Sequence, residues 1–179
     1  MIVSFNYLKL YTGNKQSIQT IKIINNFLNN LKNYTIVDAN AGIGGNSVFF
    51  CKHFKFVYCI DTSIEAIKYL EHNLKDYDNK LIINENCIDI LKIINYDVVF
   101  FDPPWGGDDY KYKKHLHLYL NDINVNIIIN SLYFYCKMVV LKAPINFHLN
   151  TNSLWKIHIN NIYKNDNKTI SFKLIIFIK

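Results

Sequence analysis

The sequence contains no arginine, so all 20 of its basic side chains are lysine. A lysine ammonium is a point charge without the planar fork of guanidinium, so it cannot hold a phosphate with two parallel hydrogen bonds. Any anionic ligand must therefore be bound by lysine point charges. Glycine and proline are also scarce, at six and three residues, and no stretch rich in them separates two regions. We expect a single domain over residues 1–179.

Two further absences limit where the protein acts. No run of about 18 apolar residues is present, which excludes a membrane-spanning helix. The N-terminus, MIVSFNYLKLY, lacks the layout of a secretory signal. The four cysteines lie far apart with no CxxC pair, so we interpret them as reduced thiols of the core. We expect an intracellular protein of the cytoplasm or nucleus, including a viral protein in its host cell, with no membrane partner.

Charge is unevenly distributed along the chain, whose formal net charge is +6. Residues 1–32 carry four lysines and no acid, and residues 123–179 carry seven lysines and one acid. Residues 33–122 carry nine lysines and thirteen acids, which gives −4 between ends of +4 and +6. An acidic centre with basic flanks suits a polyanionic partner held around a site that itself contains carboxylates.

Apolar runs of strand length alternate with segments of helical periodicity. The predicted strands are 34–38, 56–61, 80–84, 96–102 and 137–144, and the predicted helices are 17–31, 46–54, 63–75, 89–94 and 121–136. Two final β-rich runs flank a turn at 165–167. This order predicts a doubly wound, mostly parallel α/β sheet with an antiparallel C-terminal hairpin. Ligands of such sheets bind beyond the carboxyl ends of the strands, where Asp38, Asp61 and Asp102 stand.

The first of these acids opens a glycine turn, VDANAGIGGN (residues 37–46). Gly42 and Gly44 fit the first two positions of the dinucleotide fingerprint G-x-G-x-x-G, but Ser47 occupies the third, which disfavours a nicotinamide cofactor. Asp38 would repel a phosphate and attract a cation. S-adenosylmethionine carries an ammonium and a sulfonium and no phosphate, so we expect it as the cofactor.

Two more acids fit the same cofactor. Asp61 ends the second strand, where a carboxylate can accept both ribose hydroxyls, unless it only caps the helix that starts near Ser63. Asp89 follows the third strand, where the adenine edge is expected, unless it is a surface acid or a helix N-cap.

The most unusual stretch is FFDPPWGGDDY (residues 100–110). An acid followed by two prolines and an aromatic residue is typical of methyltransferases that act on exocyclic amino groups. The prolines fix the backbone and remove two N–H donors. We expect an amino group to donate hydrogen bonds to the Asp102 side chain and the Pro103 carbonyl, with a base stacked on Trp105. The alternative is a structural turn with a buried tryptophan.

Together, VDANAGIGGN, CIDTSIEAIKYLEHN and VVFFDPPWGGDDY resemble the trimethylguanosine synthase family. The residues that match its motifs are Asp38, Gly42, Gly44, Gly45, Asn46, Asp61, Asn73, Pro103, Pro104, Trp105, Gly106, Gly107 and Tyr110. The resemblance implies a Rossmann-like class I methyltransferase with a seven-stranded sheet and helices on both faces. It further implies methyl transfer to guanine N2 of a 7-methylguanosine RNA cap. Residues 1–32 would form a short helical extension and residues 33–179 the core.

The motifs and this resemblance together yield a predicted site. The expected catalytic residues are Asp102, Pro103 and Trp105. The expected cofactor residues are Asp38, Ala39, Gly42, Gly44, Asn46, Asp61, Thr62, Asp89 and Asp102. The expected substrate residues are Trp105, Gly106, Tyr110, Lys15 and Lys142. The expected partner is capped RNA, bound by a monomer.

Other functions fit parts of the same pattern. A methyltransferase of adenine N6 or of rRNA guanine N2 would use the same DPPW loop. A non-catalytic protein that binds caps or RNA could keep the scaffold without the chemistry. His115 and His117 suggest a metal or a general base, but two histidines at this spacing without further ligands are typical of a surface, so we expect no metal.

Overall fold

The computed structural model describes residues 14–164 and 166–179. Residues 1–13, which belong to the predicted extension, and Asn165, in the predicted C-terminal turn, lie outside the described residues. The chain consists of two compact units, the first reaching Phe100 and the second running from Phe101 to Lys179. The prediction of a single domain stays a prediction.

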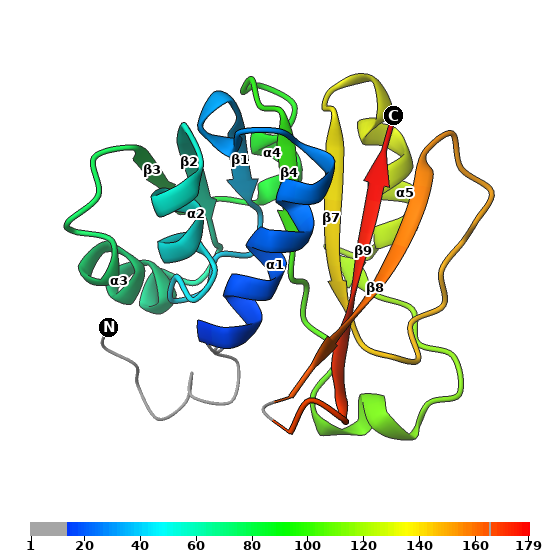
Figure 1. Cartoon of the computed structure of the whole chain (residues 1–179). Coiled ribbons are helices and arrows are strands. Elements are labelled where there is room, and N and C mark those ends of the chain that lie inside the picture. Colours follow the sequence, from blue (N-terminus) through cyan, green and yellow to red (C-terminus); the bar gives the residue numbers. More distant parts are fainter. Residues whose placement is uncertain (1–13, 165) are drawn as a thin grey trace. The chain divides into compact units, whose positions relative to one another are not determined.

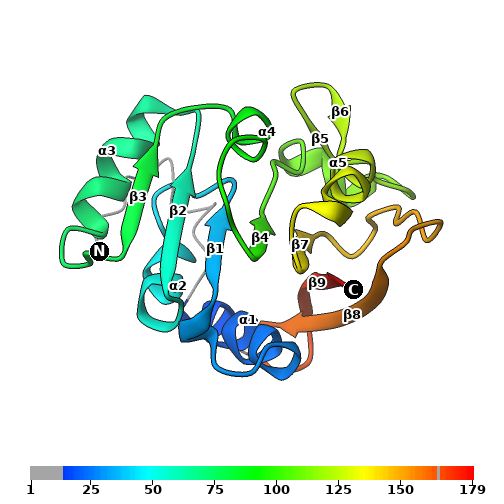
Figure 2. The ribbon, with the colours of Figure 1, turned by 90° about the horizontal axis from the view of Figure 1, so that it is seen from above.

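Parallel strands form the sheet of the first unit. They are β1 (Thr35–Asp38), β2 (Phe56–Ile60), β3 (Lys80–Ile83) and β4 (Val98–Phe101), in the order β3-β2-β1-β4 (Figure 2). All four residues of β4 are buried, as expected for a central parallel strand covered on both faces. Asp38 lies in register with Cys59 on one side and Phe100 on the other, so its side chain stands at the aligned carboxyl ends of the strands.

Two of the four described helices of the first unit begin at a short polar side chain that caps them. They are α1 (Asn14–Phe27), α2 (Ser47–His53), α3 (Ile64–Asn73) and α4 (Cys87–Ile90), with a 3-10 turn at Leu31–Asn33. Figures 1 and 2 show α1 and α2 on one face of the strands and α4 on the other. Ser63 accepts a hydrogen bond from the Ala66 amide and caps α3, as predicted. Asn86 caps α4 by accepting from Ile88, so this helix starts two residues before the predicted segment.

Antiparallel strands dominate the second unit (Figure 1). β7 (Met138–Ala143), β9 (Ile170–Ile178) and β8 (Lys156–Tyr163) pair in the order β7-β9-β8, which confirms the predicted C-terminal hairpin. The helix α5 (Val125–Ser131) packs near the start of β8, where the buried Trp155 indole donates to the Ile129 carbonyl at 3.1 Å. Across the chain the strand order is β3-β2-β1-β4-β7-β9-β8, which confirms a seven-stranded, mixed sheet.

The prediction of one helix over 121–136 is wrong at its start. Asn121 and Asp122 have φ values of 45° and 60° and form a two-residue turn between β5 (Tyr119–Leu120) and β6 (Ile123–Asn124). Asn and Asp tolerate this left-handed conformation, and two such residues in succession favour a tight hairpin. The helix then begins after Asn124, whose side chain accepts from the Asn126 amide. A 3-10 turn, Leu132–Phe134, extends it.

All four cysteines are buried, and none of them forms a disulfide within the described residues, as predicted. Burial raises the pKa of Cys51 and of Cys87 to about 12, so both stay protonated thiols near neutral pH.

Candidate active site

The glycine turn of the first unit is held in place by side chains from helices on either side of it in the sequence. Ser17, buried on α1, donates its hydroxyl to the Gly45 carbonyl at 3.3 Å and to Asn46 Oδ1 at 3.2 Å. Asn73, at the end of α3, donates to the Ile43 carbonyl at 2.9 Å. The turn is therefore a preformed structure. Asn73 was among the residues that match the family motif, whereas Ser17 was not expected in this site.

Asp61 ties the glycine turn to the end of β2. Its carboxylate accepts a hydrogen bond from the Gly42 amide at 2.8 Å and another from the Ser63 amide at 2.9 Å. Ser63 provides the cap of α3, while Asp61 connects the glycine turn to the residue that precedes this helix. Its contact with a ribose stays a prediction. Each carboxylate oxygen has two acceptor sites, so Asp61 can still accept from two ribose hydroxyls.

Asp38 lies almost fully buried beneath the turn, with Ala39 buried beside it. The Ser47 hydroxyl donates to Asp38 Oδ2 at 2.6 Å, a short bond of the kind made to ionised carboxylates. In the sequence, Ser47 stands out only as the residue that breaks the dinucleotide fingerprint. The structure gives it a positioning role, since it orients the carboxylate at the end of β1. No lysine, arginine or histidine occurs in residues 37–51, so the charge here fits the cationic ends of S-adenosylmethionine.

Two glycines of the turn are required for different reasons. Gly44 has a φ of +93°, and a Cβ added there would lie 2.8 Å from the Leu70 Cδ1 atom of α3. Gly44 therefore allows the turn to pack directly on this helix. Gly42 has a φ of +53° but faces open space, with no heavy atom within 4 Å of an added Cβ. Of these two glycines, Gly42 leaves room for a ligand on its Cβ side and Gly44 does not.

Asp89 and Thr62 lie at the surface of the first unit. The Asp89 carboxylate forms an ion pair with Lys92 at 3.0 Å and accepts from the Asn86 side chain at 2.9 Å. Thr62 is exposed next to Asp61. Contacts of both residues with a cofactor stay predictions. Lys15, half-buried on α1, is likewise only a predicted substrate residue.

The second unit begins with the DPPW loop, where Asp102 forms an ion pair with Lys142 of β7 at 2.6 Å. Their side chains are 18 % and 10 % exposed, so the pair is largely desolvated. Burial raises the pKa of Asp102 above its ordinary value, and the attraction of the Lys142 ammonium opposes that rise without cancelling it. The sequence predicts separate roles for Asp102 and Lys142, but the structure brings the two side chains together.

Lys142 also contacts the aromatic side chains around the loop. Its ammonium lies 5.8 Å from the centroid of the Trp105 ring and 5.0 Å from that of Phe172 on β9. Both distances are typical of cation–π contacts. The Asp102–Lys142 pair and the Trp105 ring thus form one cluster in the second unit.

Trp105 is half-buried and contacts Tyr110 edge to face, with ring centroids 5.2 Å apart and planes at 78°. Its indole N–H is buried, and it has no hydrogen-bond acceptor within the described part of the chain. Pro103 is buried, while Gly106 is exposed and has no heavy atom within 4 Å of an added Cβ. A partly exposed ring with open backbone beside it can accept a planar ligand.

Asn146 is a residue of this region that the sequence argument missed. Its side-chain amide donates to the carbonyl of Tyr110 and to that of Lys113, both at 2.7 Å. It therefore holds the 3-10 turn η3 (Asp108–Tyr112) that follows the DPPW loop. An asparagine in an asparagine-rich chain carries no local signal of such a contact.

The structure also bears on the remaining predictions. His115 and His117 are exposed, as expected, and among residues 14–164 and 166–179 no group of histidine, cysteine and acidic side chains could hold a metal ion. Within the same described ranges, no helix is long and apolar enough to cross a membrane.

Comparison with known proteins identifies the family. The family model described as "RNA cap guanine-N2 methyltransferase" matches residues 33–175. An uncharacterized protein of Acanthamoeba polyphaga mimivirus, L320, is 38 % identical over 124 residues, or 65 % of this chain and 48 % of that protein. The trimethylguanosine synthase of Saccharomyces cerevisiae is 30 % identical over 125 residues, or 64 % of this chain and 40 % of that protein. The chain thus corresponds to less than half the length of these relatives.

A comparison of structures confirms the fold. A crystal structure of an rRNA methylase from Streptococcus thermophilus matches with a TM-score of 0.60 at 14 % sequence identity, and covers 94 % of this chain and 99 % of that one. Such a match, with the strand order described above, confirms the predicted class I methyltransferase fold. The chain belongs to the RNA cap guanine-N2 methyltransferase family, and its cofactor is S-adenosylmethionine.

Proposed function

We propose that the protein transfers a methyl group from S-adenosylmethionine to the exocyclic N2 of 7-methylguanosine in an RNA cap, which yields di- or trimethylguanosine. The observation that carries this proposal is the cluster formed by Asp102 and Trp105 on one short loop. It combines an acceptor for an amine with an aromatic ring for the base that bears the amine. The match to the cap guanine-N2 family supports this choice of base.

The first unit supplies the residues for the cofactor. Asp38 would attract its cationic end, and Asp61 would accept its ribose hydroxyls. The glycine turn, held by Ser17 and Asn73, would line the space between them. When bound, the cofactor supplies an electrophilic methyl group on a sulfonium.

The second unit supplies the residues for the base. Methylation at N7 makes guanine cationic, and a cation on a desolvated indole gains about 1–2 kcal/mol over a neutral ring. This gain on Trp105 would select a 7-methylated cap over an unmethylated one.

The ion pair biases which acceptor the amine would use. Lys142 already takes one of the two acceptor sites of Asp102 Oδ2, so Oδ1 has the larger remaining capacity. We therefore assign Oδ1 as the acceptor for one N2 hydrogen and the Pro103 carbonyl as the acceptor for the other. Two such bonds would aim the nitrogen lone pair at the methyl group, so catalysis would come mainly from positioning. As the N–C bond forms and the bond between the methyl group and the sulfonium breaks, the N2 proton would pass to Asp102 or to water, and S-adenosylhomocysteine would be the other product.

Mass spectrometry of a cap analogue tests the proposal. Incubation of 7-methylguanosine cap dinucleotide with S-adenosylmethionine should add one or two methyl groups, whereas the dinucleotide without the N7 methyl should gain none. If adenine-containing or ribosomal RNA is methylated and the cap dinucleotide is not, the cap proposal is wrong. If S-adenosylhomocysteine also fails to bind in calorimetry, the non-catalytic alternative is favoured.

A further inference from the structure

Beyond the loop that holds Trp105, the second unit carries an exposed row of lysine, histidine and tyrosine side chains. We call it the Lys–His ridge: Lys111, Tyr112, Lys113, Lys114, His115 and His117. We propose that this ridge binds the body of a single-stranded RNA just downstream of its cap. The inference rests on the proposed function, because it assumes that the capped end lies at Trp105.

The ridge has the composition of a surface that binds single-stranded nucleic acid. All six of its side chains are exposed, and Tyr112 is 87 % exposed. Lysines neutralise phosphates, and an exposed aromatic ring offers a face on which any base can stack. No acid occurs between residues 110 and 121. Asp108 and Asp109 precede the ridge and stand nearer the base site in the sequence.

The fold orients these side chains outward. Leu116, Leu118 and Leu120 alternate with His115 and His117 and are almost fully buried, so the histidines point to the opposite side. The Leu116 amide donates to the Asn146 carbonyl at 2.9 Å, and the His148 amide donates to the Leu116 carbonyl at 2.8 Å. These two backbone hydrogen bonds connect the ridge to the segment that follows β7.

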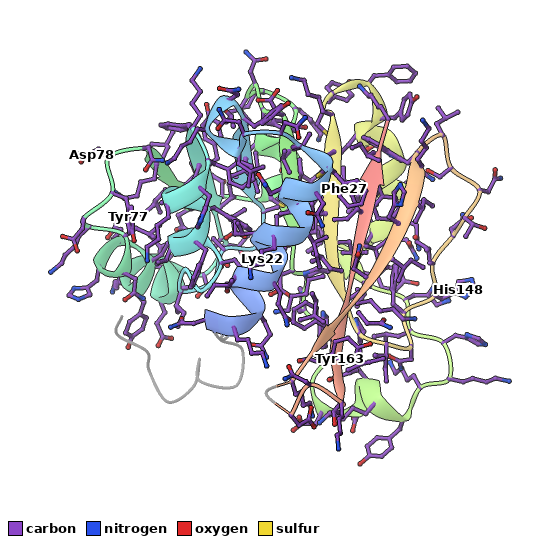
Figure 3. The ribbon with its side chains drawn as sticks, viewed as in Figure 1. Lys22, Phe27, Tyr77, Asp78, His148 and Tyr163 are labelled. Atoms are coloured by element: carbon purple, nitrogen blue, oxygen red, sulfur yellow. The ribbon has the colours of Figure 1, made fainter. Side chains whose placement is uncertain are left out.

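His148 adds a third imidazole to the ridge. It is exposed on the outside of the second unit (Figure 3), with its ring centroid 5.5 Å from that of His115 and 5.0 Å from that of His117. The three rings thus form a packed row of planar donors. Among the described residues, no group of three or more histidine, cysteine or acidic side chains is placed to hold a metal ion.

The ridge continues directly from the base site. The Tyr110 ring contacts Trp105, and the Lys111 ammonium lies 5.7 Å from the Tyr110 ring centroid. The Asn146 side chain donates to the carbonyls of Tyr110 and Lys113, so it fixes the backbone on either side of Lys111. A chain of RNA that begins at Trp105 would meet lysine within one residue of Tyr110, which is why we favour RNA over an acidic protein as the partner.

The test compares a capped RNA of about 20 nucleotides with the cap dinucleotide by fluorescence anisotropy. The variant Lys111→Ala/Lys113→Ala/Lys114→Ala should bind the capped RNA about tenfold more weakly at about 50 mM salt, and the slope of log affinity against log salt should fall by about 2. Its affinity for the dinucleotide should stay within about twofold of wild type, since these lysines would contact only phosphates beyond the cap. Tyr112→Ala should weaken RNA binding about fivefold, and Tyr112→Phe should restore it.

A matched control removes three exposed lysines from the first unit: Lys55→Ala/Lys68→Ala/Lys75→Ala. It makes the same change in net charge and should bind RNA like wild type. If the ridge variant binds capped RNA as tightly as wild type, or if the control loses as much as the ridge variant, the ridge is not the RNA site.

Uncapped RNA of the same sequence separates the two proposals. If the cap proposal fails but the ridge is correct, the dinucleotide does not bind, yet the ridge variant still loses affinity for uncapped RNA. If only the ridge inference fails, the dinucleotide binds and is methylated, but extending it to RNA adds no lysine-dependent affinity.

Discussion

The two units build their sites by different means. In the first, Ser17 and Asn73 donate hydrogen bonds to backbone carbonyls of the glycine turn, and Asp61 accepts one from the Gly42 amide. In the second, one ion pair and a set of aromatic contacts hold Asp102 and Trp105. A hydrogen-bonded turn suits a ligand that is always the same, such as a cofactor. An aromatic and ionic cluster suits a ligand that must be distinguished by its charge.

Breaking the ion pair should have the largest effect. Lys142→Met leaves the Asp102 carboxylate buried without its ammonium, so the free energy of unfolding should fall by about 3–5 kcal/mol at neutral pH. The loss should shrink as pH falls through the raised pKa of Asp102 and disappear below the ordinary carboxyl pKa, because a protonated Asp102 needs no cation. Urea unfolding of wild type and variant at several pH values measures both the loss of stability at neutral pH and its decrease as pH falls.

The double variant Asp102→Asn/Lys142→Met is the control for that prediction. It removes both charges and should recover most of the lost stability. Equal stability of the single and double variants would mean that the pair does not hold the second unit together.

Gly44→Ala should have the next largest effect, in the first unit. A methyl group 2.8 Å from Leu70, on a backbone with positive φ, should lower the free energy of unfolding by about 2–4 kcal/mol. Gly42→Ala shares the positive φ but meets open space, so it should cost only about 1 kcal/mol. Both variants introduce backbone strain, but only Gly44→Ala introduces a steric clash, so urea unfolding of the two separates these costs. An equal loss of stability in both variants would contradict the packing role of Gly44.

Trp105→Ala should sharpen the contrast between the two ligands. Loss of the stacking ring should weaken the binding of 7-methyl-GTP by about 1–3 kcal/mol, which corresponds to a dissociation constant about five- to 150-fold higher. S-adenosylhomocysteine should bind as before, because the proposed cofactor residues other than Asp102 belong to the first unit. Calorimetry with each ligand measures this. Equal losses for the two ligands would indicate a purely structural tryptophan.

The smallest expected effect is a shift in the pH dependence of kcat/KM. Because the Asp102 pKa is raised, the carboxylate needed to accept the amine forms only at higher pH than an ordinary aspartate. The acid limb of kcat/KM against pH should therefore lie above about pH 4, the ordinary value for aspartate. Asp102→Asn should abolish this limb along with most activity. Asp166→Asn is a suitable control, since the exposed Asp166 has its pKa lowered to about 2 by hydrogen bonds in the β8–β9 turn and should leave the limb unchanged.

Local signals made most of the fold predictable from the sequence. Alternating apolar runs identified the strands, and acids at their ends located Asp38, Asp61 and Asp102. Ser63 was predicted as a cap because capping depends on a few adjacent residues. The helix predicted over 121–136 began too early because apolar residues on both sides of Asn121 and Asp122 concealed a two-residue turn.

Long-range contacts of the site had no such signal. Lys142 lies 40 positions after Asp102, and Ser17 lies 29 positions before Asn46. The identity of either side chain says nothing about a partner that only the folded chain brings close. The sequence therefore offers candidate ligand-binding residues, which stay predictions, but it does not reveal the side chains that hold those residues in place.

The two tryptophans give the protein two separate optical signals. Trp155 is buried, packs against Tyr133 with ring centroids 5.0 Å apart, and donates to a backbone carbonyl, so its fluorescence should follow unfolding. Trp105 is half-buried, so its fluorescence should follow a stacked base. Replacing either one by phenylalanine would leave a protein that reports folding alone or ligand binding alone, without an attached dye.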